Sequence, residues 1–166
     1  MGGQPRKHIR SSVGKELTVN LNEAKALLDQ ISATDGRRVP EAMPAAWLRI
    51  LGRFSYLDCQ AAIEKHFEES TEWLMPAHIV QAVKAKRAQR LQAIGPVNVN
   101  RYERLDAAEE VQAIREIKQH LADGTISAED YYEYQNSPVT WEEFKTDHAR
   151  LATNSAQALA MHPGAA

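Results

Sequence analysis

Apolar residues recur at intervals of three and four positions along most of this chain, and this spacing is the feature that most constrains its fold. Such spacing places the apolar side chains on one face of an α-helix. A sustained alternation of apolar and polar positions with β-branched residues, which would indicate strands, is found nowhere in the sequence. The sequence therefore predicts an all-α protein without a sheet.

Four apolar stripes lie in residues 17–94 and predict a bundle of about four helices. The stripes are Leu21, Ala24, Leu27, Leu28 and Ile31; Trp47, Leu48, Leu51 and Phe54; Tyr56, Cys59, Ile63 and Phe67; and Ile79, Val80 and Val83. Capping-box pairs precede two of them, Asn20 with Glu23 and Ser55 with Asp58, and Pro44 and Pro76 begin the other two. On its helix Asp58 falls outside the apolar face, and we expect it to be exposed.

The fourth helix carries basic residues on its apolar side. Arg87 projects near the middle of the stripe that ends at Val83, and Arg90 lies beside it. Because burial of a guanidinium group is costly unless it is paired, we expect residues 84–94 to overhang into solvent or against a partner. Lys84, Lys86, Arg87 and Arg90 are the candidate nucleic-acid or partner-binding residues. A solvated helix end explains them equally well.

The second half of the chain is acidic. Basic residues outnumber acidic ones 14 to 10 in the first 95 positions, but acidic residues outnumber basic ones 12 to 6 in the rest. Residues 95–105 have no stripe and contain turn residues, which predicts a linker, and residues 106–152 are expected to form a short helical module. Residues 1–16 are expected to be a flexible basic arm, and residues 153–166 a frayed tail.

Five aromatic residues of the acidic half are possible anchors for a partner: Tyr131, Tyr132, Tyr134, Trp141 and Phe144. The same residues would serve as the core of a small helical module, and we expect that role for most of them.

The sequence does not indicate an enzyme, a cofactor or a metal. Neither zinc-ligand spacings nor a glycine-rich phosphate loop occur, and Cys59 and His66 are two helical turns apart, too far for a thiolate–imidazole pair. No apolar run is long enough to cross a bilayer, and the start of the chain lacks the apolar centre of a signal peptide. We expect a cytoplasmic protein that does not bind membranes.

The order of several residues resembles a known family. These are Trp47 in a short helix, Tyr56 with Ala61 and Ala62, His66 at the end of that helix, the run Trp73-Leu74-Met75-Pro76, and a helix from Ile79. The pattern, over about residues 17–94, is similar to the small all-α proteins with which phages of Gram-positive bacteria load or inhibit a hexameric replicative helicase, and to related actinobacteriophage proteins. The resemblance implies a DNA-replication adaptor in the host cytoplasm, with that helicase as partner.

Family members have a helical domain followed by a mobile tail that contacts the helicase, whereas the second half of this chain is acidic and predicted to be helical. A shorter likeness covers Ile114 to Tyr134, where residues 121–131 resemble the helical hairpin found at the C-terminal ends of many bacterial proteins. That likeness concerns structure and implies at most a role in assembly.

Two other functions fit the sequence. Closely joined helices are compatible with a helix-turn-helix DNA-binding regulator, although the helix from Pro76 lacks early base-reading side chains. Any binding to DNA is therefore expected to be weak and independent of sequence. The third possibility is an unrelated helical interaction protein.

Overall fold

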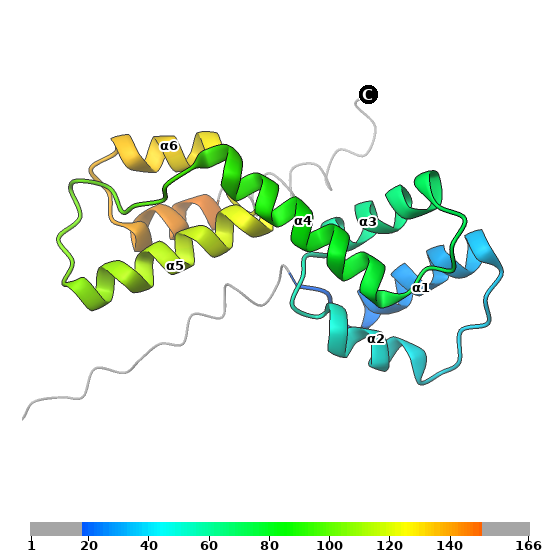
Figure 1. The fold of residues 1–166 in the computed structure, drawn as a ribbon. Coiled ribbons are helices and arrows are strands. Elements are labelled where there is room, and N and C mark those ends of the chain that lie inside the picture. The colour runs from blue at the N-terminus through cyan, green and yellow to red at the C-terminus, as the bar shows by residue number, and fades with distance from the viewer. Residues whose placement is uncertain (1–17, 151–166) are drawn as a thin grey trace, which may run out of the picture. The chain divides into compact units, whose positions relative to one another are not determined.

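The computed structural model describes residues 18–150, and the regular structure in this range is helical (Figure 1). The helices are α1 (Leu21–Asp35), α2 (Met43–Leu51), α3 (Tyr56–Glu69), α4 (Pro76–Ile94), α5 (Ala107–Asp123) and α6 (Ala128–Asn136). Residues 141–150 are also helical. The one extended pairing in the described range is an isolated bridge between Thr18 and Ser55. The prediction of an all-α fold is confirmed.

Most helix ends lie where capping signals predict them. Capping boxes start α1, α5 and α6 through the pairs Asn20–Glu23, Asp106–Glu109 and Ser127–Asp130. Thr140 and Glu143 make the same reciprocal bonds before residues 141–150. Gly36 and Gly124 end α1 and α5 with φ angles of 71° and 70°, a left-handed conformation that glycine adopts without a steric cost.

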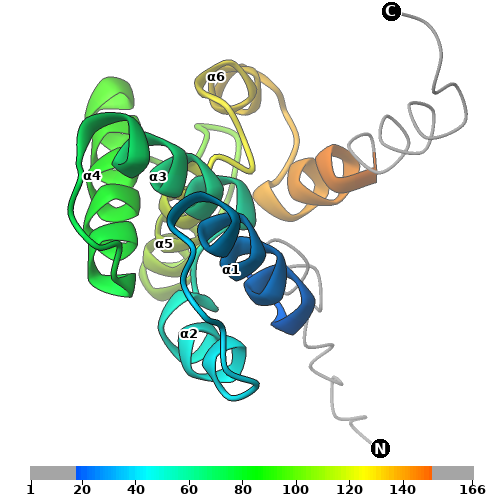
Figure 2. The ribbon, with the colours of Figure 1, turned by 90° about the vertical axis from the view of Figure 1, so that its right-hand side faces the viewer.

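The chain divides into two compact units, residues 1–56 and 57–166. In the first unit, α1 packs against α2 (Figure 1 and Figure 2). The amide of Val19 donates to the carbonyl oxygen of Phe54 at 2.9 Å and joins the two ends of this unit. Phe54 is buried, but it follows the last residue of α2 instead of lying on that helix as predicted.

The second unit contains nearly all of α3 and every later helix. Here α4 packs against α5. A core cluster is formed by Val97, Ala113, Ile117, Leu121, Ile126, Tyr131, Tyr134 and Trp141, and Leu91 and Ile94 of α4 pack against it. The apolar stripe of α5 is therefore buried only in its later part, at Ile117 and Leu121, whereas Val111 is 58% exposed.

The structure corrects the expectation of a linker at residues 95–105. Val97 belongs to the core cluster, and the Asn100 side chain is buried. Its amide nitrogen donates to the carbonyl oxygens of Tyr134, Ser137 and Val139 at 3.3, 3.1 and 2.6 Å, and its Oδ1 accepts from the amides of Tyr102 and Glu103. The turn residues and the absence of an apolar stripe correctly indicated a loop. The bonds that hold this loop to the rest of the unit, however, involve Tyr134, Ser137 and Val139, more than 30 positions away.

The boundary between the units also differs from the expected one. Residues 17–94 were expected to form one domain, whereas the division falls between Tyr56 and Leu57 and places α4 in the second unit. The reason is that the last turns of α4 are apolar on the side of the core cluster, through Leu91 and Ile94. The predicted arm of residues 1–16 and tail of residues 153–166 lie outside the described residues.

Candidate functional site

The predicted basic site lies within the second unit and is largely used for internal ion pairs. Arg90 binds Asp58 in a bidentate manner, with Nη1–Oδ2 and Nη2–Oδ1 distances of 2.7 and 2.8 Å. Nζ of Lys86 lies 3.0 Å from Oδ1 of the same carboxylate. Arg90 also donates to the carbonyl oxygen of Ala122 at 2.9 Å. Two cations of α4 thus meet at one carboxylate of α3, and Arg90 also links it to the end of α5.

Asp58 is only 3% exposed, so the expectation that it faces solvent is wrong. Burial by itself would raise the pKa of its carboxyl group, but the hydrogen bonds from Arg90 and Lys86 outweigh that effect and hold the pKa below its usual value. The carboxylate is therefore charged at neutral pH. It supplies the partner that makes burial of the Arg90 guanidinium acceptable.

Arg87 is used in the same way. It lies 3.2 Å from Oδ1 of Asp123 and donates to Oε1 of Gln119, also at 3.2 Å. Burial raises the pKa of Asp123, although Arg87 acts against this. Lys84 is exposed, and no ion pair is found for it within residues 18–150. The expected overhang of residues 84–94 is therefore corrected: the basic side of α4 packs on its own unit.

The five predicted aromatic anchors are mostly core residues. Tyr131, Tyr134 and Trp141 are buried, and Phe144 packs against the same core cluster. Tyr132 is about half exposed. Burial and a hydrogen bond to Glu103 raise the pKa of the Tyr134 phenol far above its usual value. Of these five residues, only Trp141 also lines the groove that is described next.

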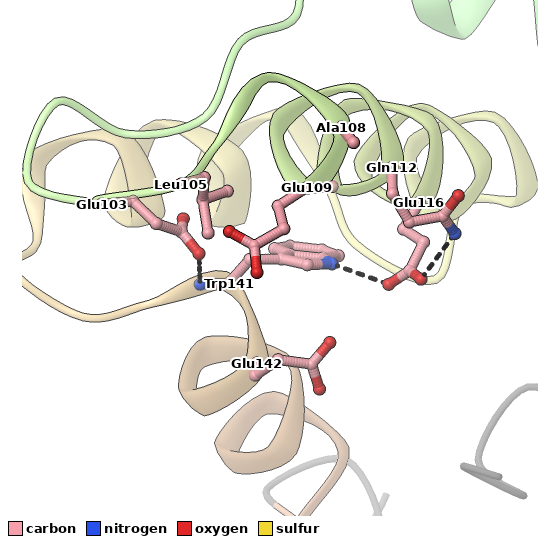
Figure 3. Close-up of a pocket in the computed structure, with 9 residues that line it drawn as sticks. Glu103, Leu105, Ala108, Glu109, Gln112, Glu116, Trp141 and Glu142 are labelled. Carbon is pink, nitrogen blue, oxygen red and sulfur yellow. Dashed lines mark hydrogen bonds between the residues drawn. The ribbon is translucent and has the colours of Figure 1, made fainter. Parts of the chain in front are cut away.

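A groove with a volume of about 470 Å³ lies in the second unit, and Figure 3 shows residues that line it. We call it the acidic groove. It is lined by Glu103, Leu105, Ala108, Glu109, Gln112, Ala113, Glu116, Trp141 and Glu142. One wall is the first half of α5, the second is the loop before α5, and the third is the start of the helix at residues 141–150 (Figure 3). Apolar side chains and the indole thus lie among four carboxylates.

Glu103 holds two walls of the groove together. Its Oε2 accepts a hydrogen bond from the Tyr134 hydroxyl at 2.5 Å, and its Oε1 accepts from the amide of Trp141 at 3.1 Å (Figure 3). The amide of Trp141 lies at a helix N-terminus, where a negative charge is favourable. Oδ1 of Asn100 accepts from the backbone amide of Glu103 and so fixes its position. The Glu103 side chain then connects the loop to α6 through Tyr134 and to the last helix through Trp141.

Glu116 connects the remaining walls. Its Oε1 accepts from Nε2 of Gln112 at 3.0 Å, and its Oε2 accepts from the indole Nε1 of Trp141 at 3.3 Å and from Nζ of Lys145 at 3.2 Å. Burial by itself would raise the pKa of Glu116, but these hydrogen bonds outweigh it and leave the pKa below its usual value. The carboxylate is therefore charged in the groove at neutral pH.

Glu109 and Glu142 form the open rim of the groove. Oε2 of Glu109 closes the capping box of α5, and Oε1 of Glu142 accepts from Lys145 at 2.8 Å. Within residues 18–150 no hydrogen bond is found to the second oxygen of either carboxylate. Ala108 is also exposed and adds a small apolar surface to the groove. The arrangement suits a ligand that carries both positive charge and apolar groups.

This groove is not evident from the sequence. The acidic second half and Trp141 are evident from the sequence, but Glu103 falls in the segment 95–105 that is expected to be a linker. The relevant signal was the excess of glutamate around the start of α5, which does not show how the loop and the last helix would close around it.

The comparisons with known proteins leave the family open. No family model, curated protein or solved structure matches this chain. Within the described residues, no group of three or more histidine, cysteine, aspartate or glutamate side chains is placed to hold a metal ion. None of the helices described is both long and apolar enough to cross a bilayer. The geometry of the acidic groove is therefore the feature that bears on function.

Proposed function

We propose that this chain is an adaptor protein that binds a basic, partly apolar segment of a partner protein in the acidic groove. The observation that carries the proposal is the groove itself, whose lining combines the exposed carboxylates of Glu109 and Glu142 with Ala108 and the indole of Trp141. A lysine or arginine side chain pairs with carboxylates through its charged end and covers apolar surface with its methylene groups. Charge complementarity of this kind favours a specific orientation of the partner.

A hexameric replicative helicase is the first partner to test. The support for it is the resemblance of residues 17–94 to phage helicase loaders and inhibitors. In those proteins the segment after the helical domain contacts the helicase. The corresponding half of this chain contains the acidic groove. The proposal thus assigns the helicase contact to residues 103–142, and loading and inhibition are both compatible with it.

The alternatives receive less support. The candidate DNA-contacting residues Lys86, Arg87 and Arg90 are paired with Asp58 or Asp123, which reduces the positive charge available to phosphates. Burial raises the pKa of the Cys59 thiol to about 12, so this cysteine is not a nucleophile at neutral pH. We therefore favour protein binding over DNA binding and over catalysis.

The test compares two lysine substitutions at adjacent exposed positions in the first turn of α5. Ala108→Lys places a bulky positive charge in the groove, whereas Ala107→Lys makes the same change outside it. Both cations are equally unfavourable at a helix N-terminus, so their effects on stability should match. Binding of the full chain to a helical peptide with lysine on one face and leucine on the other is measured by calorimetry.

Ala108→Lys is expected to weaken peptide binding by at least about tenfold, and Ala107→Lys by less than about twofold. Equal effects of the two substitutions would show that the groove is not the binding site. The same pair is then assayed with purified replicative helicases from Gram-positive and actinobacterial hosts, with and without ATP. If the chain binds the peptide but none of the helicases, the proposed adaptor function is supported and the helicase is rejected as its partner.

A further inference from the structure

The acidic groove already has a cation at one end. Lys145, on the same helix as Trp141, is 15% exposed in its side chain. Its Nζ lies 2.8 Å from Oε1 of Glu142 and 3.2 Å from Oε2 of Glu116. Both carboxylates belong to the lining of the groove, whereas Lys145 itself does not. A primary ammonium group of the protein itself therefore contacts two of the four carboxylates of the groove.

Lys145 is charged in this position. Burial alone would lower the pKa of its amine, but the hydrogen bonds to Glu142 and Glu116 outweigh that effect and raise the pKa above its usual value. The cation neutralises part of the charge of the groove. A partner lysine that approached Glu142 would meet a carboxylate with one oxygen already engaged.

The two ion pairs of Lys145 differ in how readily they can be exchanged. The Glu142 side chain is 71% exposed, and an ion pair with an exposed carboxylate contributes little to stability. Glu116 keeps bonds from Gln112 and from the Trp141 indole when Lys145 moves away. Release of Lys145 therefore leaves no lining carboxylate buried without a partner, so that a second cation can replace it at a small cost.

We propose that Lys145 is an internal competitor for the acidic groove, occupying in the free protein the subsite that receives a lysine or arginine of the partner. This inference depends on the proposed function of the groove. It predicts that Lys145 lowers the affinity for a basic segment and that the segment displaces its ammonium group from Glu142. The affinity of the adaptor is then set by one residue outside the groove lining.

The experiment measures binding of the lysine–leucine peptide to the full chain and to three variants. Lys145→Gln removes the competing charge, and Lys145→Arg retains it. Lys118→Gln removes the same charge from an exposed position on α5 that does not line the groove. Thermal melts of all four proteins establish that binding is compared between folded samples.

Lys145→Gln is expected to bind the peptide about three- to tenfold more tightly than the unmodified chain, because one close cation no longer competes. Lys118→Gln is expected to change affinity by less than about twofold, since distant exposed charges are screened. Lys145→Arg should bind like the unmodified chain. Equal affinities of Lys145→Gln and Lys118→Gln, or tighter binding by Lys145→Arg, would overturn the competitor role and leave the groove as a binding site.

If the proposed function itself is wrong, the binding measurements give a different result from the one that rejects only the competitor role. If neither the unmodified chain nor Lys145→Gln binds the peptide, both the function and the competitor role are rejected. A direct readout of displacement is the side-chain resonance of Lys145 in a ¹⁵N-lysine-labelled sample, which is expected to change on saturation with peptide while that of Lys118 does not. An unchanged Lys145 resonance in a saturated complex would exclude displacement.

Discussion

The second unit contains two charged regions that use their ions in opposite ways. Around Asp58, two cations from α4 satisfy one carboxylate that is nearly excluded from solvent. Around the acidic groove, four carboxylates lie at a cavity and Lys145 is the one cation found to contact two of them within residues 18–150. The first region is closed by its own charges, and the second retains acceptor oxygens at its rim. The number of charges in a segment therefore does not predict where a partner binds, because charges that are paired inside the protein are not available to it.

The largest expected effect is on the free energy of unfolding when the carboxylate of the closed region is removed. Asp58→Ala leaves Arg90 and Lys86 without their shared carboxylate and is expected to lower the free energy of unfolding by about 2–3 kcal/mol. The estimate lies below the range for fully buried pairs because the Arg90 side chain is 29% exposed. Urea denaturation measures it. Glu68→Ala, an exposed site on the same helix, is the control and should cost less than about 0.5 kcal/mol. A similar cost for both would mean that the ion pairs contribute no stability.

The second-largest expected difference is in salt dependence, which should be greater for binding at the groove than for the stability contributed by Asp58. Raising the ionic strength from about 0.1 M to about 1 M shortens the Debye length from about 10 Å to about 3 Å. Peptide binding at the exposed rim is expected to weaken by about tenfold. The stability difference between the unmodified chain and Asp58→Ala is expected to change much less, because that pair is shielded from solvent. Equal salt dependence of the two quantities would contradict the distinction between a closed and an open region.

The pH dependence of the Asp58 pair gives a smaller effect. The pKa of Asp58 in the folded protein lies below its usual value, so the pair stabilises the fold above about pH 4, the pKa range of an aspartate in an unfolded chain. This stabilisation is lost as the pH falls through the lower pKa of the folded state. The difference in unfolding free energy between the unmodified chain and Asp58→Asn should therefore shrink below about pH 4 and stay constant from about pH 5 to 8. A difference that grows on acidification would show that the shift has the opposite sign.

Two glycines with the same backbone geometry provide the smallest contrast. Alanine at Gly36 or Gly124 should cost about 1 kcal/mol, because both have φ near +70°. A Cβ atom at Gly124 would lie 2.9 Å from Cζ of Arg90, whereas none lies within 4 Å at Gly36. Gly124→Ala is therefore expected to cost about 0.5–1 kcal/mol more, since Arg90 must shift while bound to Asp58. Thermal or urea unfolding checks this, and equal costs would show that Arg90 moves freely.

Much of the fold was predictable from short segments. Most of the stripe of α1 and the later part of that of α5 are buried as expected, and capping pairs three residues apart mark the starts of α1, α5 and α6. The expectation that most aromatic residues of the acidic half form a core is also confirmed for Tyr131, Tyr134 and Trp141. The caps and stripes could be predicted because the residues that form each of them lie within a few helical turns of one another.

The errors concern residues whose partners are distant. Arg90 was expected to overhang because its carboxylate partner lies 32 positions earlier in the chain. Residues 95–105 were interpreted as a linker because the buried bonds of Asn100 reach residues 34 to 39 positions later. The groove was not predicted for the same reason, since Glu116 and Lys145 are 29 positions apart.

The sequence by itself determined where the helices begin and end and which face of each is apolar, because helix capping and the period of 3.6 residues are local properties of the chain. It also determined the excess of acidic residues in the second half. Only the tertiary structure decided which charges are paired inside the protein and which remain at a surface. Ion pairs such as Asp58–Arg90 and Glu116–Lys145 depend on how the helices pack, and no local rule specifies which distant carboxylate a given cation will meet.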